Sequence, residues 1–102
     1  MDPNQQRIEI AKACGWKLQQ DKFPDYVNDL NAMHEAEALM TSRDGWNFQC
    51  GYTLELRQVV LRRRESCNAA QTDHWMIHAT AAQRAEAFLR TIGKWIEIPK
   101  QP

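Results

Sequence analysis

The chain has 102 residues, a common size for one domain, so the sequence predicts a single domain over residues 1–102. Apolar residues make up 43% of the chain and charged residues 25%. This is the composition of a globular protein, and it excludes an intrinsically disordered one. Lys plus Arg and Asp plus Glu each total 13, so no net charge draws the protein towards nucleic acid or an anionic membrane. Binding to either would need a local patch.

Hydropathy and cysteine usage predict a cytoplasmic protein without a membrane partner. Residues 1–7 lack the apolar stretch of a signal peptide, and no run approaches the roughly 18 to 20 apolar residues of a membrane span. The cysteines, Cys14, Cys50 and Cys67, are odd in number and include no closely spaced pair. This pattern favours reduced thiols.

The N-terminal segment carries the start and stop signals of a helix. Asp2 and Gln5 have the spacing of a capping box, and Pro3 suits the first helical position. Gly15 supplies a left-handed stop. These residues predict a helix over about 3–14.

A second helix is expected over about 29–40, because apolar residues recur there at steps of three and four. They are Leu30, Met33, Ala36 and Met40. Glu37 interrupts this row, and we expect its carboxylate to reach solvent at the edge of the row.

The clearest strand pattern begins at Trp46, where apolar and polar residues alternate over about 46–57. The apolar positions are Trp46, Phe48, Cys50, Tyr52, Leu54 and Leu56. A period of two predicts a β-strand, with a bulge or bend at Gly51. A helix is the alternative for 52–61, since several apolar residues there also recur at steps of three and four. A polar connection over 62–73 and a second short strand over 74–78 are expected to follow.

The last predicted helix covers about 81–92. Thr80 and Gln83 form a second capping box, and Gly93 follows the last apolar position. Together the elements predict an α+β fold in the order α-α-β-β-α. In this small α/β sandwich, three helices pack on a small antiparallel sheet, and Phe88 and Leu54 lie in the shared core.

Two segments carry a family resemblance. Residues 24–37 (PDYVNDLNAMHEAE) and 78–95 (HATAAQRAEAFLRTIGKW), together with residues 14–16 (CGW), resemble the phage ABA sandwich domain family of small phage and prophage proteins. The resemblance implies an α/β sandwich in a viral or prophage setting, so the cytoplasm expected for this chain is that of a bacterial host cell. The family has no assigned activity, so the resemblance supplies no catalytic residues.

The sequence predicts no metal site and no cofactor. Cys50, Cys67, His74 and His78 are zinc-ligating residue types, but they form no Cys-x-x-Cys pair. On a strand His74 and His78 would stand about 13 Å apart, too far for one tetrahedral ion. His34 and Glu37 have an H-x-x-E spacing, which is weak evidence for a ligand pair without a second such motif.

Two groups of residues are candidates for binding. Arg57 and the run Arg62, Arg63 and Arg64 form a basic cluster that could bind the phosphates of a nucleic acid. Trp95 and Ile98, if exposed, could contact another protein.

The leading functional prediction is a non-catalytic protein-binding module, a phage accessory protein that inhibits a host enzyme or defence system in the anti-CRISPR or anti-defence manner. Its expected partner is a host protein or complex, and a homodimer through an edge or face of the sheet is a further expectation. The first alternative is a nucleic-acid-binding accessory protein that uses the basic cluster. The second is a small nucleotide-binding protein or enzyme that uses His34, Glu37 or His74.

Overall fold

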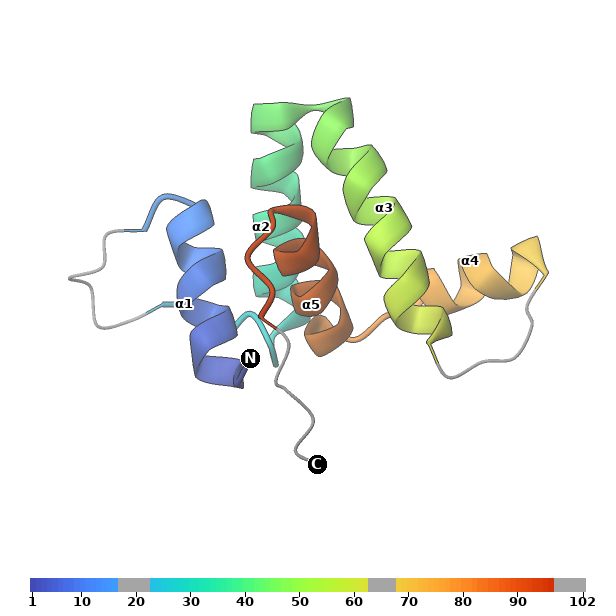
Figure 1. The fold of residues 1–102 in the computed structure, drawn as a ribbon, viewed down its shortest axis with the longest axis horizontal. Helices are drawn as coiled ribbons and strands as arrows, with labels where there is room; N and C mark the ends of the chain where they lie inside the picture. Colours follow the sequence, from blue (N-terminus) through green and yellow to red (C-terminus); the bar gives the residue numbers. More distant parts are fainter. Residues whose placement is uncertain (17–22, 63–67, 97–102) are drawn as a thin grey trace.

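A computed structural model describes residues 1–16, 23–62 and 68–96. Within these ranges the chain forms five α-helices and no β-strand (Figure 1). They are α1 (Pro3–Ala13), α2 (Leu30–Asp44), α3 (Trp46–Leu61), α4 (Ala69–Ile77) and α5 (Ala81–Thr91). The predicted α+β sandwich is therefore wrong, because the segments 46–57 and 74–78, predicted as strands, lie in α3 and α4.

Capping boxes explain where three of the described helices begin. Asp2 accepts from the backbone N–H of Gln5 at the start of α1, and Thr80 accepts from that of Gln83 at the start of α5. In both cases the glutamine side chain accepts a hydrogen bond from the capping residue's own N–H. Both predicted capping boxes are confirmed. Asn68 starts α4 in the same way, within a segment that was predicted to be an irregular connection.

A single residue, Gly45, separates α2 from α3. Its backbone angles, φ 59° and ψ −134°, lie in a region that side-chain-bearing residues avoid. Gly45 is the C-cap residue of α2 and the N-cap residue of α3. The two helices lie side by side as a hairpin (Figure 1). The helix predicted over 29–40 thus continues to Asp44.

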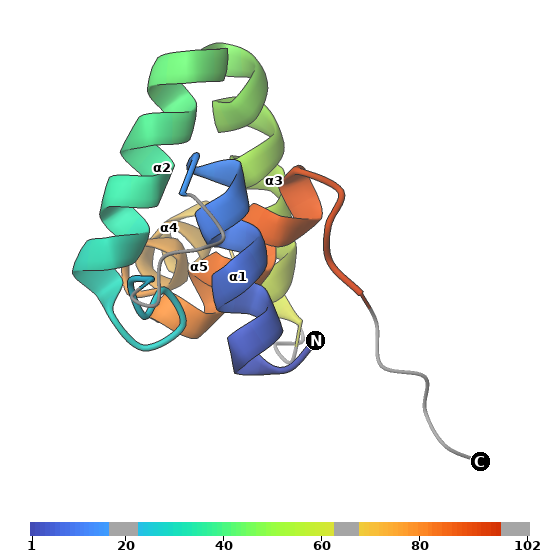
Figure 2. The ribbon, with the colours of Figure 1, turned by 90° about the vertical axis from the view of Figure 1, so that its left-hand side faces the viewer.

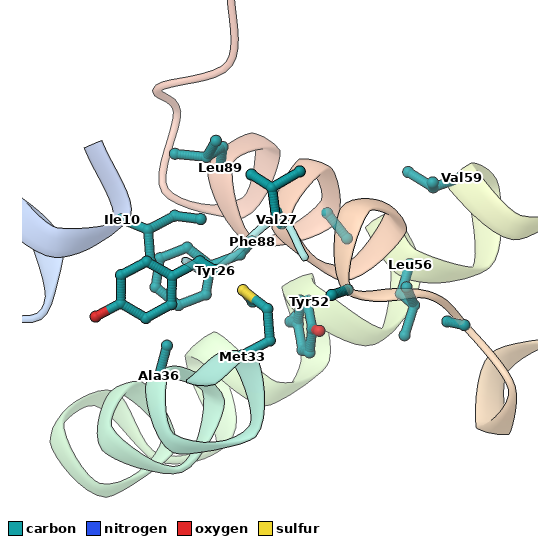
Figure 3. Packing of buried hydrophobic residues seen from close by; sticks show 14 of the residues in the cluster. Ile10, Tyr26, Val27, Met33, Ala36, Tyr52, Leu56, Val59, Phe88 and Leu89 are labelled. Carbon is teal, nitrogen blue, oxygen red and sulfur yellow. The ribbon is translucent and has the colours of Figure 1, made fainter. Parts of the chain in front are cut away.

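The core lies around α5, which packs against α1, α2 and α3 (Figure 2). Phe88 is completely buried at its centre, as predicted. The rings of Phe88 and Phe48 meet edge to face with their centroids 5.6 Å apart. Figure 3 shows Ile10, Met33 and Tyr52 gathered around Phe88. Helices from four parts of the chain therefore share one apolar interior.

Leu54 does not belong to this core. Its side chain is 59% exposed, so the prediction that Leu54 packs with Phe88 is wrong. On α3 the buried residues are Phe48, Tyr52, Leu56, Val59 and Val60. This set has the helical spacing that the sequence offered as the alternative for 52–61.

The outermost helix is α4, which lies beside the last turns of α3 at the edge of the bundle (Figure 1). Of its own residues only Thr72 is buried. Its C-terminal end is held by Arg84 of α5, whose guanidinium donates to the carbonyl oxygens of Met76 and Ile77. Among the described residues, no helix has both the length and the apolar character needed to cross a membrane.

Candidate functional site

The most conspicuous surface feature is a row of apolar side chains on the side of α3 that faces away from α5. Trp46, Cys50 and Leu54 occupy positions i, i+4 and i+8, and all three are exposed. Trp46 is 80% exposed. Side chains four residues apart are neighbours on a helix surface, so these residues form one stripe, which we call the outer row. Isolated exposed apolar residues are ordinary, whereas a stripe that includes an almost fully exposed Trp is typical of a contact surface.

A pocket opens next to the outer row, at the α2–α3 turn. It has a volume of about 270 Å³ and is lined by Thr41, Gly45, Trp46 and Gln49. Small-molecule sites usually enclose about 300–1,000 Å³, so this pocket suits a single protein side chain better than a whole ligand. The hydroxyl of Thr41 donates to the carbonyl of Glu37 at 2.8 Å. It therefore already has a partner within the protein.

A buried polar cluster lies on the opposite side of α3. The guanidinium of Arg84 is 3.3 Å from a carboxylate oxygen of Glu37 and donates to the carbonyl of Ala79 at 3.2 Å. The expectation that Glu37 reaches solvent is wrong, because its carboxylate pairs with Arg84 and its side chain is only 18% exposed. His34 follows at the edge of the cluster, with its Nδ1 3.8 Å from Glu37.

Tyr52 completes the cluster from α3. Its hydroxyl oxygen is buried and makes no hydrogen bond with the described residues. Burial raises the pKa of Tyr52 well above its ordinary value, and the negative charge of Glu37 raises it further. A phenol that holds its proton so firmly is a poor acid or base at neutral pH.

The cluster joins α2 and α4 to α5. Among the described residues, the guanidinium of Arg84 binds the Glu37 carboxylate and carbonyl groups at the end of α4. Three surface pockets on the described residues, including the one at Trp46, contain neither His34 nor Glu37 nor His74. These pockets therefore do not provide the polar cleft that an enzyme using those residues would need.

The basic cluster is only partly described, since Arg63 and Arg64 lie outside the described residues. Arg57 is exposed on α3, whereas Arg62 forms an ion pair with Glu86. Arg57 and Arg62 are five positions apart, which places them about 140° apart around a helix. The described arginines therefore do not form one continuous basic face.

Glu86 is the centre of a small ion-pair network on α5. It binds Arg62 and also Arg90, whose Nε lies 2.8 Å from the carboxylate. Burial acts to raise the pKa of Glu86, but hydrogen bonds and charge from the two arginines outweigh it and lower the pKa overall. The charge that Arg62 could offer to a phosphate is thus already compensated.

Trp95 is half-buried and packs against the core. The guanidinium of Arg90 lies 5.2 Å from the centre of its ring, a cation–π contact. Trp95 therefore contributes mainly to the end of α5. Ile98, its companion in the predicted contact, lies outside the described residues.

The two histidines that a strand would have separated come together on α4. The rings of His74 and His78 have centroids 4.5 Å apart, because residues at i and i+4 lie on the same side of a helix. No group of three or more His, Cys, Asp or Glu side chains that could hold a metal ion occurs among residues 1–16, 23–62 and 68–96. Cys50 is exposed on α3, and Cys67 lies outside these ranges.

Sequence could have indicated the outer row from its spacing. Trp46, Cys50 and Leu54 follow one another at steps of four, but the same residues also satisfy the period-two pattern that favoured a strand. No known protein family, curated protein or solved structure matches the chain.

Proposed function

We propose that the protein is a non-catalytic binding module that contacts a partner protein through the outer row of α3. The observation that carries this proposal is the exposure of Trp46, Cys50 and Leu54 as one stripe on a regular helix. An amphipathic helix enters an apolar groove of its partner through apolar side chains that recur at steps of three and four, and the outer row recurs at steps of four. Trp is also among the residues that contribute most to binding energy at interfaces.

The partner that this surface fits is a protein with an apolar groove the width of one helix. The resemblance to phage proteins favours a protein of the bacterial host, such as an enzyme or defence complex that the module would inhibit. The sheet implied by that resemblance is absent from the described residues, which therefore offer no sheet edge or face for a homodimer. The resemblance to phage proteins therefore supports a bacterial lysate as the source of the partner.

The proposal is tested by affinity capture from a bacterial lysate with three forms of the protein. The double variant Trp46→Ala/Leu54→Ala removes the two largest side chains of the outer row. Trp75→Ala removes a less exposed Trp from α4 and serves as the matched control. Both variants should keep the helix content of the wild type in circular dichroism, because the altered side chains are at least partly exposed.

Wild type and Trp75→Ala should capture the same protein, and the double variant should capture at least about tenfold less of it, as expected for loss of interface hot spots worth 2 kcal/mol or more. Equal recovery by all three forms would contradict the proposal. Sedimentation analysis of the same samples identifies self-association, in which wild type is a dimer and the double variant a monomer.

A further inference from the structure

His74 and His78 form a pair that neither the core nor the outer row uses. His74 lies in the last turn of α4, His78 is the residue that caps the C-terminus of this helix, and both are exposed. Their ring centroids are 4.5 Å apart, with a tilt of 47° between the ring planes. In this arrangement small rotations of the two side chains can direct one nitrogen of each ring towards a common point.

We propose that this pair is a binding site for a divalent transition-metal ion, with the imidazole nitrogens of His74 and His78 as its two protein ligands. Imidazole is a preferred ligand of Zn²⁺, Ni²⁺ and Cu²⁺, with nitrogen-to-zinc distances of about 2.0–2.1 Å. Two histidines at i and i+4 on one helix face are also the arrangement that zinc enzymes use to present two ligands to one ion.

The site would be open and exchangeable. No third His, Cys, Asp or Glu of the described residues completes a metal-binding group, so water would occupy the other coordination positions. Among the three ions, Cu²⁺ should bind most tightly, because affinity for nitrogen ligands rises from Ni²⁺ to Cu²⁺ and falls again at Zn²⁺.

Binding at this position would stabilise the least buried helix of the bundle. Only Thr72 of α4 is buried, and an ion that joins His74 to His78 would span the final turn. A positive charge is favourable at the C-terminal end of a helix. The guanidinium of Arg84 lies near the same end, but its charge is paired with Glu37 at 3.3 Å.

The test is isothermal titration of the untagged protein with NiCl₂, where one ion per chain is expected. Loss of a residue that only hydrogen-bonds to a metal ligand weakens metal binding about 10- to 100-fold. Loss of a ligand itself, in His74→Ala or His78→Ala, should therefore weaken Ni²⁺ binding at least tenfold. The chain contains three histidines, and the third, His34, provides the matched control. His34→Ala should bind Ni²⁺ as wild type does.

A spacing variant distinguishes a chelating pair from two separate histidines. Asp73→His/His74→Ala keeps the number of histidines on α4 but separates them by five positions, about 140° around the helix. This variant should lose affinity as the single variants do. Wild-type affinity in the spacing variant, or in both single variants, would overturn the proposal, as would the absence of Ni²⁺ binding by the wild-type protein.

Trp75 offers an independent readout, because its ring centroid lies 5.0 Å from that of His74. Cu²⁺ held by the pair should quench the fluorescence of Trp75, and Trp75→Phe should remove the quenched part of the signal. Quenching that persists in His74→Ala/His78→Ala would place the ion elsewhere and overturn the assignment. Because the altered residues are exposed, circular dichroism should show unchanged helix content in every variant.

Discussion

The guanidinium of Arg84 lies 3.3 Å from the carboxylate of Glu37, and the same group donates to three backbone carbonyls at the end of α4. Arg84 is only 8% exposed. One side chain of α5 therefore binds α2 through charge and α4 through hydrogen bonds. A buried cation of this kind is tolerated because each of its polar contacts is satisfied.

Arg84→Ala should lower the free energy of unfolding by about 2–4 kcal/mol, somewhat less than for a fully buried pair because Glu37 retains some access to water. The variant leaves the Glu37 carboxylate without its partner and the last carbonyls of α4 without a donor. Urea denaturation measures the change. The control is Arg62→Ala, which should cost less than about 1 kcal/mol because Arg62 itself is exposed and Glu86 keeps Arg90 as its second partner. Equal losses in the two variants would contradict the structural role of Arg84.

Phe88→Ala and Leu54→Ala should differ sharply, although the sequence placed both residues in one core. Phe88 is completely buried, and its truncation should cost about 3–5 kcal/mol of stability through lost burial and a new cavity. Leu54 is 59% exposed, so its truncation should cost less than about 1 kcal/mol. Thermal and urea unfolding of both variants measure this difference. A large loss in Leu54→Ala would show that α3 is oriented differently.

The incorrect prediction of a strand at 46–57 has a specific physical origin. Phe48, Tyr52 and Leu56 form the buried row of α3, and the outer row is offset from it by two residues. Two residues correspond to about 200° around a helix, so apolar rows on opposite sides produce apolar residues at every second position. Periodicity alone cannot distinguish this case from a strand. The ambiguity arises because the second row is apolar without being buried.

Local signals were sufficient at two helix starts with a capping box, those of α1 and α5, but the capping box at Asn68 was missed. The capping boxes at Asp2 and Thr80 and the buried face around Phe88 could be predicted because each depends on residues close in sequence. The pairing of Arg84 with Glu37 could not be predicted in this way, since the two residues are 47 positions apart. The proximity of His74 and His78 was missed for a different reason, because it depends on α4 being a helix.

Gly45→Ala should destabilise the protein by about 1–3 kcal/mol, because the alanine would have to adopt φ 59° and ψ −134° at the α2–α3 turn. A β-carbon at this position would meet no atom within 4 Å, so the cost comes from the backbone alone. Asp44→Ala, one position earlier at the end of α2, is the matched control and should change stability by less than about 0.5 kcal/mol. Urea denaturation of both variants makes the comparison. Similar midpoints would show that the turn does not depend on glycine.

The two tyrosines of the chain should make stability fall in alkaline solution. Burial is the main cause, and the neighbouring Cys14 the second, that raises the pKa of Tyr26 from its ordinary value near 10 to about 12. Burial also raises the pKa of Tyr52 well above its ordinary value. Above about pH 10 the unfolded chain releases phenolic protons that the folded protein retains, so stability decreases as pH rises through this range. Urea unfolding at several alkaline pH values measures the slope.

Ultraviolet absorbance of the phenolate follows the same groups directly. In the folded protein little phenolate should form near pH 10, whereas both tyrosines should ionise there in concentrated urea. Lysine side chains also titrate in this range, so Tyr26→Phe/Tyr52→Phe is the control. Its stability should depend less steeply on alkaline pH than that of the wild type. Half-ionisation of the tyrosines near pH 10 in the folded state would contradict the burial of Tyr26 and Tyr52, and with it the packing of α3 against α5.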